Sequence, residues 1–263
     1  MVHMAGATDV GRVRSNNEDA IEWDERLGLA ILADGMGGHR AGEVASRTAA
    51  QHVKAELARP LALWDTRGEG RRERVAVARL VKAAVEQANL RVYEVSSSGP
   101  QYAGMGTTIV VAVFLGHCVT VCHVGDSRLY RLRDAQLEQL TEDHSLVQEL
   151  VRRGHLSEPE ARVADYRNVL MRALGVEPQV RSELRQHRIE RGDIYLLCSD
   201  GLSNQVTAPE IEESLQRCGD DLEGAASELI ELANARGGAD NISVIVTRIG
   251  AAPVTEDAGS HSG

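Results

Sequence analysis

The sequence predicts an α+β fold in which two antiparallel β-sheets pack face to face and pairs of helices cover them outside, a four-layer α-β-β-α sandwich. Between residues 107 and 133, three strand-like runs are joined by links too short for crossover helices, which indicates antiparallel pairing. The first run, TTIVVAVFL, is apolar on both faces, so each face needs a covering layer. Elsewhere, paired helical segments interrupt the strands, which favours α+β layers over an alternating parallel sheet.

The amino-terminal half is expected to begin with a strand over residues 27–33, a short apolar run. Residues 41–58 are rich in alanine, and within residues 75–92 valine and alanine recur at steps of three and four. Both segments therefore predict helices, the second strongly amphipathic. Between them, residues 59–70 contain Pro60 and two glycines, which predicts a loop.

The carboxyl-terminal half contains most of the predicted strands. They are expected at residues 107–115, 118–124, 127–133, 182–189, 193–199 and 241–249. Helices are expected at residues 208–217 and 222–235. Residues 145–174 contain helical pieces without one sustained period, and are expected to form a small subdomain outside the main layers.

The chain of 263 residues is long enough to bury a core without help from disulfides. No internal repeat and no linker divides it, so residues 5–250 are expected to form a single domain. Residues 1–4 include a second methionine directly after a histidine, and they are expected to be a cloning remnant or disordered. Residues 251–263 are small and polar, which predicts a disordered tail.

The composition argues against several classes of function. The chain has 29 basic and 39 acidic residues, a net charge of −10, whereas binding a phosphate backbone needs a surplus of Lys and Arg. Nucleic acid is therefore not expected as a partner. Neither Lys54 nor Lys82 follows a glycine, so the phosphate-binding loop G-x-x-x-x-G-K-[ST] is absent. The chain also lacks the G-x-S-x-G elbow of serine hydrolases and the H-E-x-x-H pair of zinc proteases.

The cysteines and the hydropathy pattern bear on the compartment. The four cysteines lack C-x-x-C spacing, and three adjoin apolar runs, which is typical of reduced core thiols in a cytosol. No apolar stretch reaches the roughly 18 residues that span a bilayer, and the amino-terminus lacks the apolar segment of a signal peptide. We therefore expect a cytoplasmic protein without a membrane partner, and a monomer.

Four aspartates at the ends of predicted strands indicate the chemistry. Each lies beside a glycine or another turn residue, and they are Asp34, Asp126, Asp200 and Asp240. One such junction is typical of an ordinary turn, but strand ends at one edge of a sheet can converge. Carboxylates gathered there repel one another unless divalent cations bind between them. The repeated junction therefore predicts a metal centre.

A polar segment before the first predicted strand adds Arg14, Glu18 and Asp19 to this set. A planar guanidinium can hold two phosphate oxygens at once, and carboxylates supply the oxygen ligands of hard cations. Because few nitrogen or sulfur ligands accompany them, Mg²⁺ or Mn²⁺ is favoured over Zn²⁺. Together these residues favour metal-dependent phosphate chemistry.

Eight blocks in fixed order resemble the bacterial, serine/threonine-specific form of the metal-dependent PPM-type protein phosphatases (protein phosphatase 2C-like). They span roughly residues 5–249 and read DVGRVRSNNEDA, ILADGMGGHRAGEVAS, GMGTTIV, HVGDSRLYRL, LTEDHSLVQELV, LMRALG, GDIYLLCSDGLS and GADNISVIV. The family fold is a β-sandwich of two antiparallel sheets flanked by helix pairs, which agrees with the layers inferred above. Residues 146–174 correspond to the family's flap, a segment beside the active site that is expected to influence substrate choice.

The resemblance implies a role for each matching acid. The implied metal ligands are Glu18, Asp34, Gly35, Asp126, Asp200 and Asp240. Asp34 would bridge two ions, with the Gly35 carbonyl as a further ligand. Asp200 and Asp240 would hold the second ion, and Glu18 would reach the centre directly or through water. Asp126 and Asp200 would share a third, weaker site.

The resemblance also implies a mechanism. A hydroxide that bridges the two cations attacks phosphorus in line, without a covalent phosphoenzyme. Arg14 matches the arginine that binds the substrate phosphate, and Asp19 matches a residue that orients metal-bound water. Animal members carry a histidine, the proposed general acid, where this chain has Met36. His39 is the nearest candidate for that role, and the alternative is a loop histidine with a structural hydrogen bond.

The function implied is hydrolysis of phosphoserine and phosphothreonine in proteins, with Mn²⁺ or Mg²⁺ as cofactor. The expected partners are phosphorylated proteins, including a bacterial serine/threonine kinase or its substrates. One alternative is a pseudophosphatase that keeps the sandwich as a scaffold for a phosphoprotein, although such a scaffold would not need four converging acids. Another is a phosphatase dedicated to a single signalling protein, which would share the chemistry and differ only in its partner.

Overall fold

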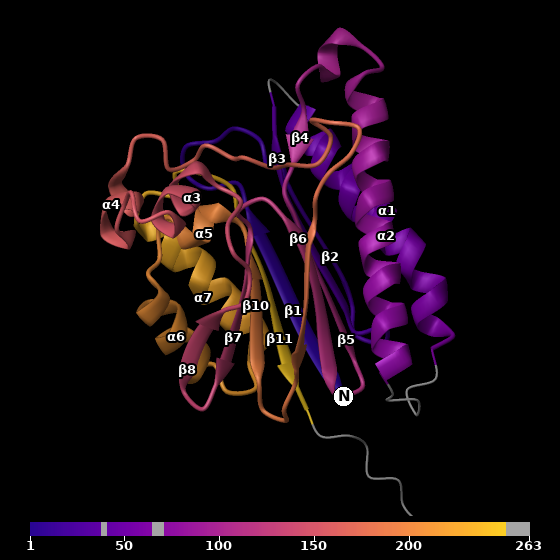
Figure 1. Ribbon diagram of the computed structural model, residues 1–263. Helices are drawn as coiled ribbons and strands as arrows, with labels where there is room; N and C mark the ends of the chain where they lie inside the picture. Colours follow the sequence, from indigo (N-terminus) through magenta and orange to yellow (C-terminus); the bar gives the residue numbers. More distant parts are fainter. Residues whose placement is uncertain (38–40, 65–70, 251–263) are drawn as a thin grey trace, which may run out of the picture.

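The computed structural model describes residues 1–37, 41–64 and 71–250. Two antiparallel sheets pack face to face, and helices cover the outer face of each (Figure 1). The predicted α-β-β-α sandwich is confirmed. The expected tail, residues 251–263, lies outside the described residues.

Each sheet is antiparallel throughout its described neighbouring pairs. The first has the order β2 (Asp19–Asp24), β3 (Leu29–Met36), β5 (Ile109–Leu115), β6 (Cys118–Val124) and β9 (Glu183–Arg188), with the short β4 (Gly106–Thr107) paired to β3. The second has the order β1 (Val2–Asp9), β11 (Ile242–Ile249), β10 (Ile194–Cys198), β7 (Arg128–Arg133) and β8 (Gln136–Gln139).

Helices form the outer layers. Two long ones, α1 (Ala41–Ala62) and α2 (Arg71–Ser96), cover the first sheet, and the second is covered by α5 (Asp200–Ser203), α6 (Ala208–Arg217) and α7 (Leu222–Ala235). The remaining helices are α3 (Leu146–Arg152), α4 (Glu158–Val163) and the 3₁₀ turn η1 (Pro100–Tyr102). The boundaries of α6 and α7 are those that the apolar spacing predicts.

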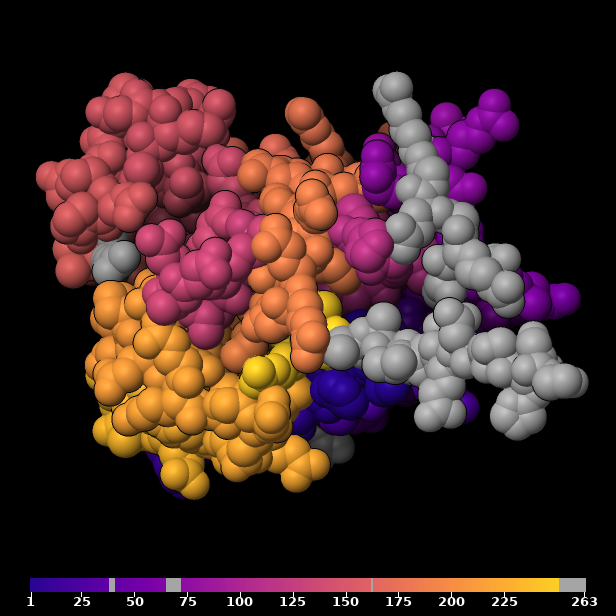
Figure 2. Space-filling view, turned by 90° about the horizontal axis from the view of Figure 1, so that it is seen from below, coloured from indigo at the N-terminus to yellow at the C-terminus, as the bar shows by residue number. Residues whose placement is uncertain are grey.

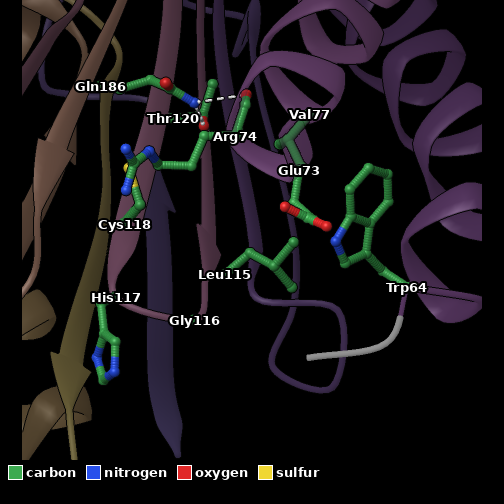
Figure 3. Close-up of a pocket in the computed structure, with 10 residues that line it drawn as sticks. All are labelled: Trp64, Glu73, Arg74, Val77, Leu115, Gly116, His117, Cys118, Thr120 and Gln186. Carbon is green, nitrogen blue, oxygen red and sulfur yellow. Dashed lines mark hydrogen bonds between the residues drawn. The ribbon is translucent and has the colours of Figure 1, made fainter. Parts of the chain in front are cut away.

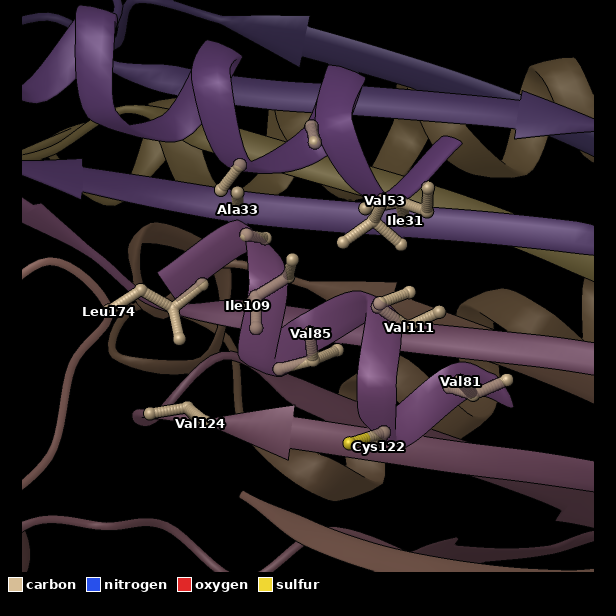
Figure 4. Packing of buried hydrophobic residues seen from close by; sticks show 14 of the residues in the cluster. Ile31, Ala33, Val53, Val81, Val85, Ile109, Val111, Cys122, Val124 and Leu174 are labelled. Atoms are coloured by element: carbon tan, nitrogen blue, oxygen red, sulfur yellow. The ribbon is translucent and has the colours of Figure 1, made fainter. Parts of the chain in front are cut away.

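Three clusters of buried apolar side chains join the four layers. Between the two sheets, Phe114 packs edge-to-face on Tyr195 at 5.0 Å. Val53 of α1 and Val85 of α2 pack with Ile31 of β3 in the cluster beneath the long helices (Figure 4). Burying each such side chain contributes about 1.5–3 kcal/mol. Burial on both faces explains why the central strands are continuously apolar.

Of the two alternatives expected for residues 1–4, disorder is wrong. Val2–Asp9 form β1, in which Met4 pairs with Thr247 and is buried in the cluster between the sheets. The strand satisfies the hydrogen-bonding groups along one side of β11, and the burial of Met4 adds apolar stabilisation. Tertiary pairing thus outweighs the weak strand propensity of the run VHMAGATD.

Three further elements differ from the sequence prediction. Helix α1 continues through Pro60, where a loop was expected, because Leu57 and Leu61 on its inner face are buried against the first sheet. A proline in the last turn removes only one helical hydrogen bond. The edge strands β2 and β8 have the sequences DAIEWD and QLEQ, which lack an apolar run because one side of an edge strand faces solvent.

Residues 146–174 form the expected small subdomain, which contains α3 and α4. In the view from below, these salmon-coloured residues project from the body beside the orange and yellow residues of α6 and α7 (Figure 2). Ser145 caps α3, because its side chain accepts a hydrogen bond from the Gln148 amide. Among the described residues, no helix has the length and apolar character needed to cross a membrane.

Candidate metal centre

One cavity of about 430 Å³ collects nearly all of the predicted site residues. It lies at the end of the sandwich where β3 and β4 pair, at the top in Figure 1. The predicted residues that line it are Arg14, Glu18, Asp34, Gly35, Asp126, Asp200 and Asp240. The remaining two are Asp19, which lies beside the cavity, and His39, which lies outside the described residues.

The sandwich brings the four strand-end aspartates together from different elements. Asp34 lies near the end of β3, and Asp126 follows β6 in the same sheet. From the second sheet, Asp200 begins α5 directly after β10, and Asp240 lies just before β11. Packing the sheets face to face places these ends at one edge, as the repeated junction predicts.

Hydrogen bonds through two threonines hold the main chain of Asp34. The Asp34 amide donates to Thr108 Oγ1 at 3.0 Å, and Thr107 Oγ1 donates to the Asp34 carbonyl at 2.8 Å. The Thr108 hydroxyl also lies 2.7 Å from that of Ser127, the residue after Asp126. The Asp34 backbone is thus fixed without using its carboxylate, and the same hydroxyl pair connects it to the Asp126 turn.

Asn241 is a site residue that the sequence argument missed. Its Oδ1 accepts from the Glu18 amide at 2.8 Å, and its Nδ2 donates to the carbonyls of Val10 and Asn16 at 3.0 and 2.9 Å. It therefore ties the amino-terminal segment that carries Arg14 and Glu18 to the start of β11. The only trace of this role in the sequence is its position directly after Asp240 in the block GADNISVIV.

Two glycines allow the main chain and the Glu18 carboxylate to approach closely. A Cβ on Gly42 would lie 2.1 Å from Glu18 Oε2, and a Cβ on Gly35 would lie 2.2 Å from the Gly42 carbonyl oxygen. Only glycine fits at these two positions, because the Cβ of any other residue would overlap with Glu18 Oε2 or with the Gly42 carbonyl oxygen. The Glu18 side chain therefore rests against the first turn of α1 and faces the cavity.

Asp19 lies next to Asp34 across the β2–β3 ladder. Its Oδ2 accepts from Ser199 Oγ at 2.9 Å, whereas its buried Oδ1 has no hydrogen-bond partner among the residues that the structure describes. A buried oxygen without a partner is costly unless it holds a proton, a water or a cation. Asp19 therefore has one oxygen anchored to the second sheet and one free beside Asp34.

Burial and mutual repulsion raise the pKa values of this carboxylate cluster. Burial, reinforced by Asp19 and Asp200, raises the pKa of Asp34 well above its usual range. Burial, with repulsion from Asp200 and Asp240, raises the pKa of Asp19 to about 7. Burial and the charge of Asp240 raise the pKa of Asp200 to about 6. Such a cluster binds protons or cations readily, since either relieves the repulsion.

The pKa of Asp126, a predicted ligand of the third metal site, is raised in the same way. Burial, then the charges of Asp200 and Asp143, raises the pKa of Asp126 to about 7. The side chains that face the cavity offer carboxylate, amide and hydroxyl oxygens, which suit Mg²⁺ or Mn²⁺. The residues present therefore fit the hard cations that the sequence predicts.

Arg14 lies on the rim of this cavity. Its Nη2 is 2.8 Å from Asp240 Oδ2, and its side chain is 56% exposed. The guanidinium therefore remains accessible to a ligand that enters from solvent. It is the cationic side chain among the residues that line the cavity in the described part of the chain.

The raised pKa values predict how stability depends on pH without divalent ions. The pKa of Asp126 is about 7 in the folded protein but about 4 in an unfolded chain. Between these values the folded protein binds more protons than the unfolded chain, so this group's stabilisation is lost as pH rises from about 4 through about 7. Thermal unfolding in a chelating buffer should show a smaller loss for Asp126→Asn than for wild type. Equal slopes for the two proteins would contradict the assignment.

A smaller cavity of about 100 Å³ lies between α2 and the β5–β6 hairpin (Figure 3). Trp64 and Val77 line it together with Leu115 and Cys118. Gln186 Nε2 donates to Thr120 Oγ1 at 2.8 Å on its wall. Among the described residues that line it, none is a predicted site residue, and Glu73 supplies the one carboxylate.

Comparison with known sequences is consistent with this geometry. Residues 11–234 match the family model described as Protein phosphatase 2C. The chain is 38% identical over 248 residues to serine/threonine phosphatase stp of Listeria monocytogenes, covering 93% of this chain and 95% of that protein. It is 41% identical over 249 residues to serine/threonine protein phosphatase PstP of Mycobacterium tuberculosis, covering 95% of this chain and 45% of that protein.

Comparison with solved structures also finds a serine/threonine protein phosphatase. The crystal structure of the catalytic domain of serine/threonine protein phosphatase PstP, in complex with two manganese ions, has 38% sequence identity to this chain and a TM-score of 0.82. The match covers 95% of this chain and 99% of that one. A solved relative with the same fold thus contains two manganese ions.

Proposed function

The chain belongs to the protein phosphatase 2C family of serine/threonine phosphatases, and we propose that it hydrolyses phosphoserine and phosphothreonine in proteins with Mn²⁺ or Mg²⁺ as cofactor. The observation that carries this proposal is one cavity in which Asp34, Asp126, Asp200 and Asp240 meet, with Arg14 on the rim. Acids that raise one another's pKa values suit cation binding, and a rim guanidinium suits a phosphate.

Asp34 is the proposed common ligand of two core ions. Glu18 and Gly35 would be further ligands of the first ion, and Asp200 and Asp240 would be ligands of the second. Asp126 and Asp200 are the proposed ligands of a third, weaker ion. When bound, such ions activate water and neutralise charge on the phosphoryl group. The hydrogen bonds through Thr107 and Thr108 keep the Asp34 carboxylate aimed at the cavity without consuming its oxygens.

Two further residues have proposed roles in phosphate binding and in proton transfer. Arg14 is proposed to bind phosphate oxygens through its guanidinium, which is open to solvent on the rim. Asp19 is proposed to orient a reacting water. Its partner-free Oδ1 and a pKa of about 7 let it hold or release a proton near neutral pH. His39, the proposed general acid, lies outside the described residues.

The proposed substrates are phosphorylated proteins, among them a bacterial serine/threonine kinase or its targets. Asn168 and Leu170 of the flap line the metal cavity, so residues flanking the phosphorylated side chain would meet the flap on entry. All four cysteines are free thiols, which supports the cytoplasm as the proposed compartment. A monomer is the proposed state.

The test of this function uses a phosphothreonine peptide and free phosphoserine, each with and without Mn²⁺. We expect Mn²⁺-dependent release of phosphate from the peptide and much slower release from the free amino acid, since only the peptide reaches the flap. Release from neither substrate would favour the scaffold alternative. Equal release from both would exclude a preference for proteins.

Arg14→Ala is expected to lower kcat/KM for the phosphopeptide by about 10- to 100-fold, because a charge-assisted hydrogen bond to phosphate is lost. Most of the loss should appear in KM, because the guanidinium contacts the phosphate and not the cations. Arg14→Lys keeps the charge without the two parallel N–H groups and should fall between Ala and wild type. Steady-state kinetics at saturating Mn²⁺ measure this, and an unchanged KM for Arg14→Ala would contradict the role.

A further inference from the structure

His144 is a buried side chain that the proposed mechanism does not use. It lies between β8 and α3 and is 7% exposed. Its imidazole stacks on that of His123, with ring centroids 4.7 Å apart and an interplanar angle of 15°. Glu183 lies beside the pair, with Oε2 3.5 Å from His144 Nε2.

Two hydrogen bonds join His144 to Gly125, the residue before Asp126. The Gly125 amide donates to His144 Nδ1 at 3.2 Å, and the His144 amide donates to the Gly125 carbonyl at 2.9 Å. Gly125 has φ +106°, and a Cβ there would lie 2.6 Å from Thr108 Cγ2. The turn that carries the Asp126 carboxylate is therefore held by His144 on one side and confined by Thr108 on the other.

The same residue also holds the end of the flap. The His144 carbonyl accepts from the Met171 amide at 2.8 Å, and the nearby Leu146 amide donates to the Val169 carbonyl at 2.9 Å. Between these two contacts lies Leu170, which lines the metal cavity. His144 thus connects the Asp126 turn with the flap segment at that cavity.

These contacts assign the proton on the His144 ring. Gly125 N–H is buried and donates to His144 Nδ1, and leaving it unpaired would cost about 1–3 kcal/mol. Nδ1 must therefore be the acceptor, and Nε2 carries the proton and faces the Glu183 carboxylate. Arg172 Nη1 also lies 3.1 Å from Nε2, and because a guanidinium only donates, this contact competes with Gly125 for the single acceptor nitrogen of a neutral imidazole. The Gly125 amide takes precedence, because the half-buried guanidinium has other N–H groups and access to water.

The proton assignment argues against a metal site in this cluster. The candidate ligand atoms of His123, His144 and Glu183 lie within 4.8 Å of one another. However, a protonated Nε2 cannot ligate a cation, and Nδ1 is occupied by Gly125. Burial, with the neighbouring His123 and Arg172, lowers the pKa of His144 to about 4, which is consistent with a neutral ring. The cluster is therefore a hydrogen-bonded support.

We infer that His144 is a positioning residue for Asp126, whose turn it holds through Nδ1 while its main chain holds the flap segment at the same cavity. This inference rests on the proposed third metal site, of which Asp126 is a ligand. Fixing the turn before metal binding reduces the ordering that binding would otherwise require.

Substituting His144 by asparagine or by glutamine distinguishes the role of Nδ1 from that of Nε2. In His144→Asn the side-chain oxygen can occupy the place of Nδ1 and accept from Gly125, whereas in His144→Gln the amide reaches the place of Nε2 and leaves the Gly125 amide unpaired. We expect His144→Gln to weaken the third, weakest Mn²⁺ site about tenfold, and His144→Asn to change it by less than about twofold. The two core sites should keep their affinity in both variants, and kcat should recover at saturating Mn²⁺.

Calorimetric Mn²⁺ titration of the full chain measures these affinities, with Asp126→Asn as the reference that removes the third site. If Asp126→Asn loses the weak site but His144→Gln keeps its affinity, the role of His144 is refuted and the third site stands. If Asp126→Asn binds as many ions as wild type, the proposed third site itself is refuted. Equal weakening in both His144 variants would also overturn the role of Nδ1.

A measurement on the unmodified protein does not depend on the folding of any variant. Nitrogen-15 NMR of the imidazole should show His144 at neutral pH with the proton on Nε2 and none on Nδ1. A ring protonated on Nδ1, or on both nitrogens, would overturn the inference, because Nδ1 could not then accept from Gly125.

Discussion

Asp34→Asn is expected to lower kcat for a phosphothreonine peptide at least about 10³-fold at saturating Mn²⁺, because losing a shared ligand removes several kcal/mol of transition-state stabilisation. Burial, reinforced by the charges of Asp19 and Asp200, raises the pKa of Asp34 well above its usual range. Asparagine keeps the shape and removes the charge. Single-turnover phosphate release measures the effect.

The control for this prediction is Asp220→Asn, which removes the same charge from a side chain that is 93% exposed and paired with Arg248. It should leave kcat unchanged. Without divalent ions, Asp34→Asn should be at least as stable as wild type, because it relieves repulsion within the cluster. Near-normal turnover of Asp34→Asn with Mn²⁺ would contradict the proposed mechanism.

Removal of divalent ions is expected to reduce phosphate release to background, and addition of Mn²⁺ or Mg²⁺ is expected to restore it. The same treatment should lower the melting temperature at pH 8, which lies above the pKa values of Asp19, Asp126 and Asp200, so that these acids are charged and repel one another. Asp200→Asn should reduce this metal-dependent difference in melting temperature, since Asp200 is a proposed ligand of two sites. Activity that persists in a chelating buffer would contradict the role of the cations.

Much of the site was predictable because its residues are marked by local sequence. Asp34, Asp126 and Asp200 each end or follow a strand whose apolar run is visible in the sequence. Strands that pack in two sheets must bring some of their ends to one edge, so convergence followed from the pattern. The resemblance to a known family then gave each acid a role.

Other features depend on contacts between distant parts of the chain, which local patterns do not reveal. Asn241 accepts from Glu18, 223 residues away in the sequence. His144 supports Gly125 only because the β7–β8 hairpin turns the chain back on itself. The strand formed by Val2–Asp9 likewise depends on the open side of β11. In each case the tertiary partner supplies the stabilisation.

Asp34, Asp200 and Asp240 are proposed to hold two divalent ions at the cavity whose rim carries Arg14. A crystal structure with Mn²⁺, recorded on both sides of the manganese absorption edge, tests it most directly. We expect two strong anomalous peaks that share Asp34, with a weaker third beside Asp126. No peak at Asp34, or manganese bound instead among His123, His144 and Glu183, would contradict it.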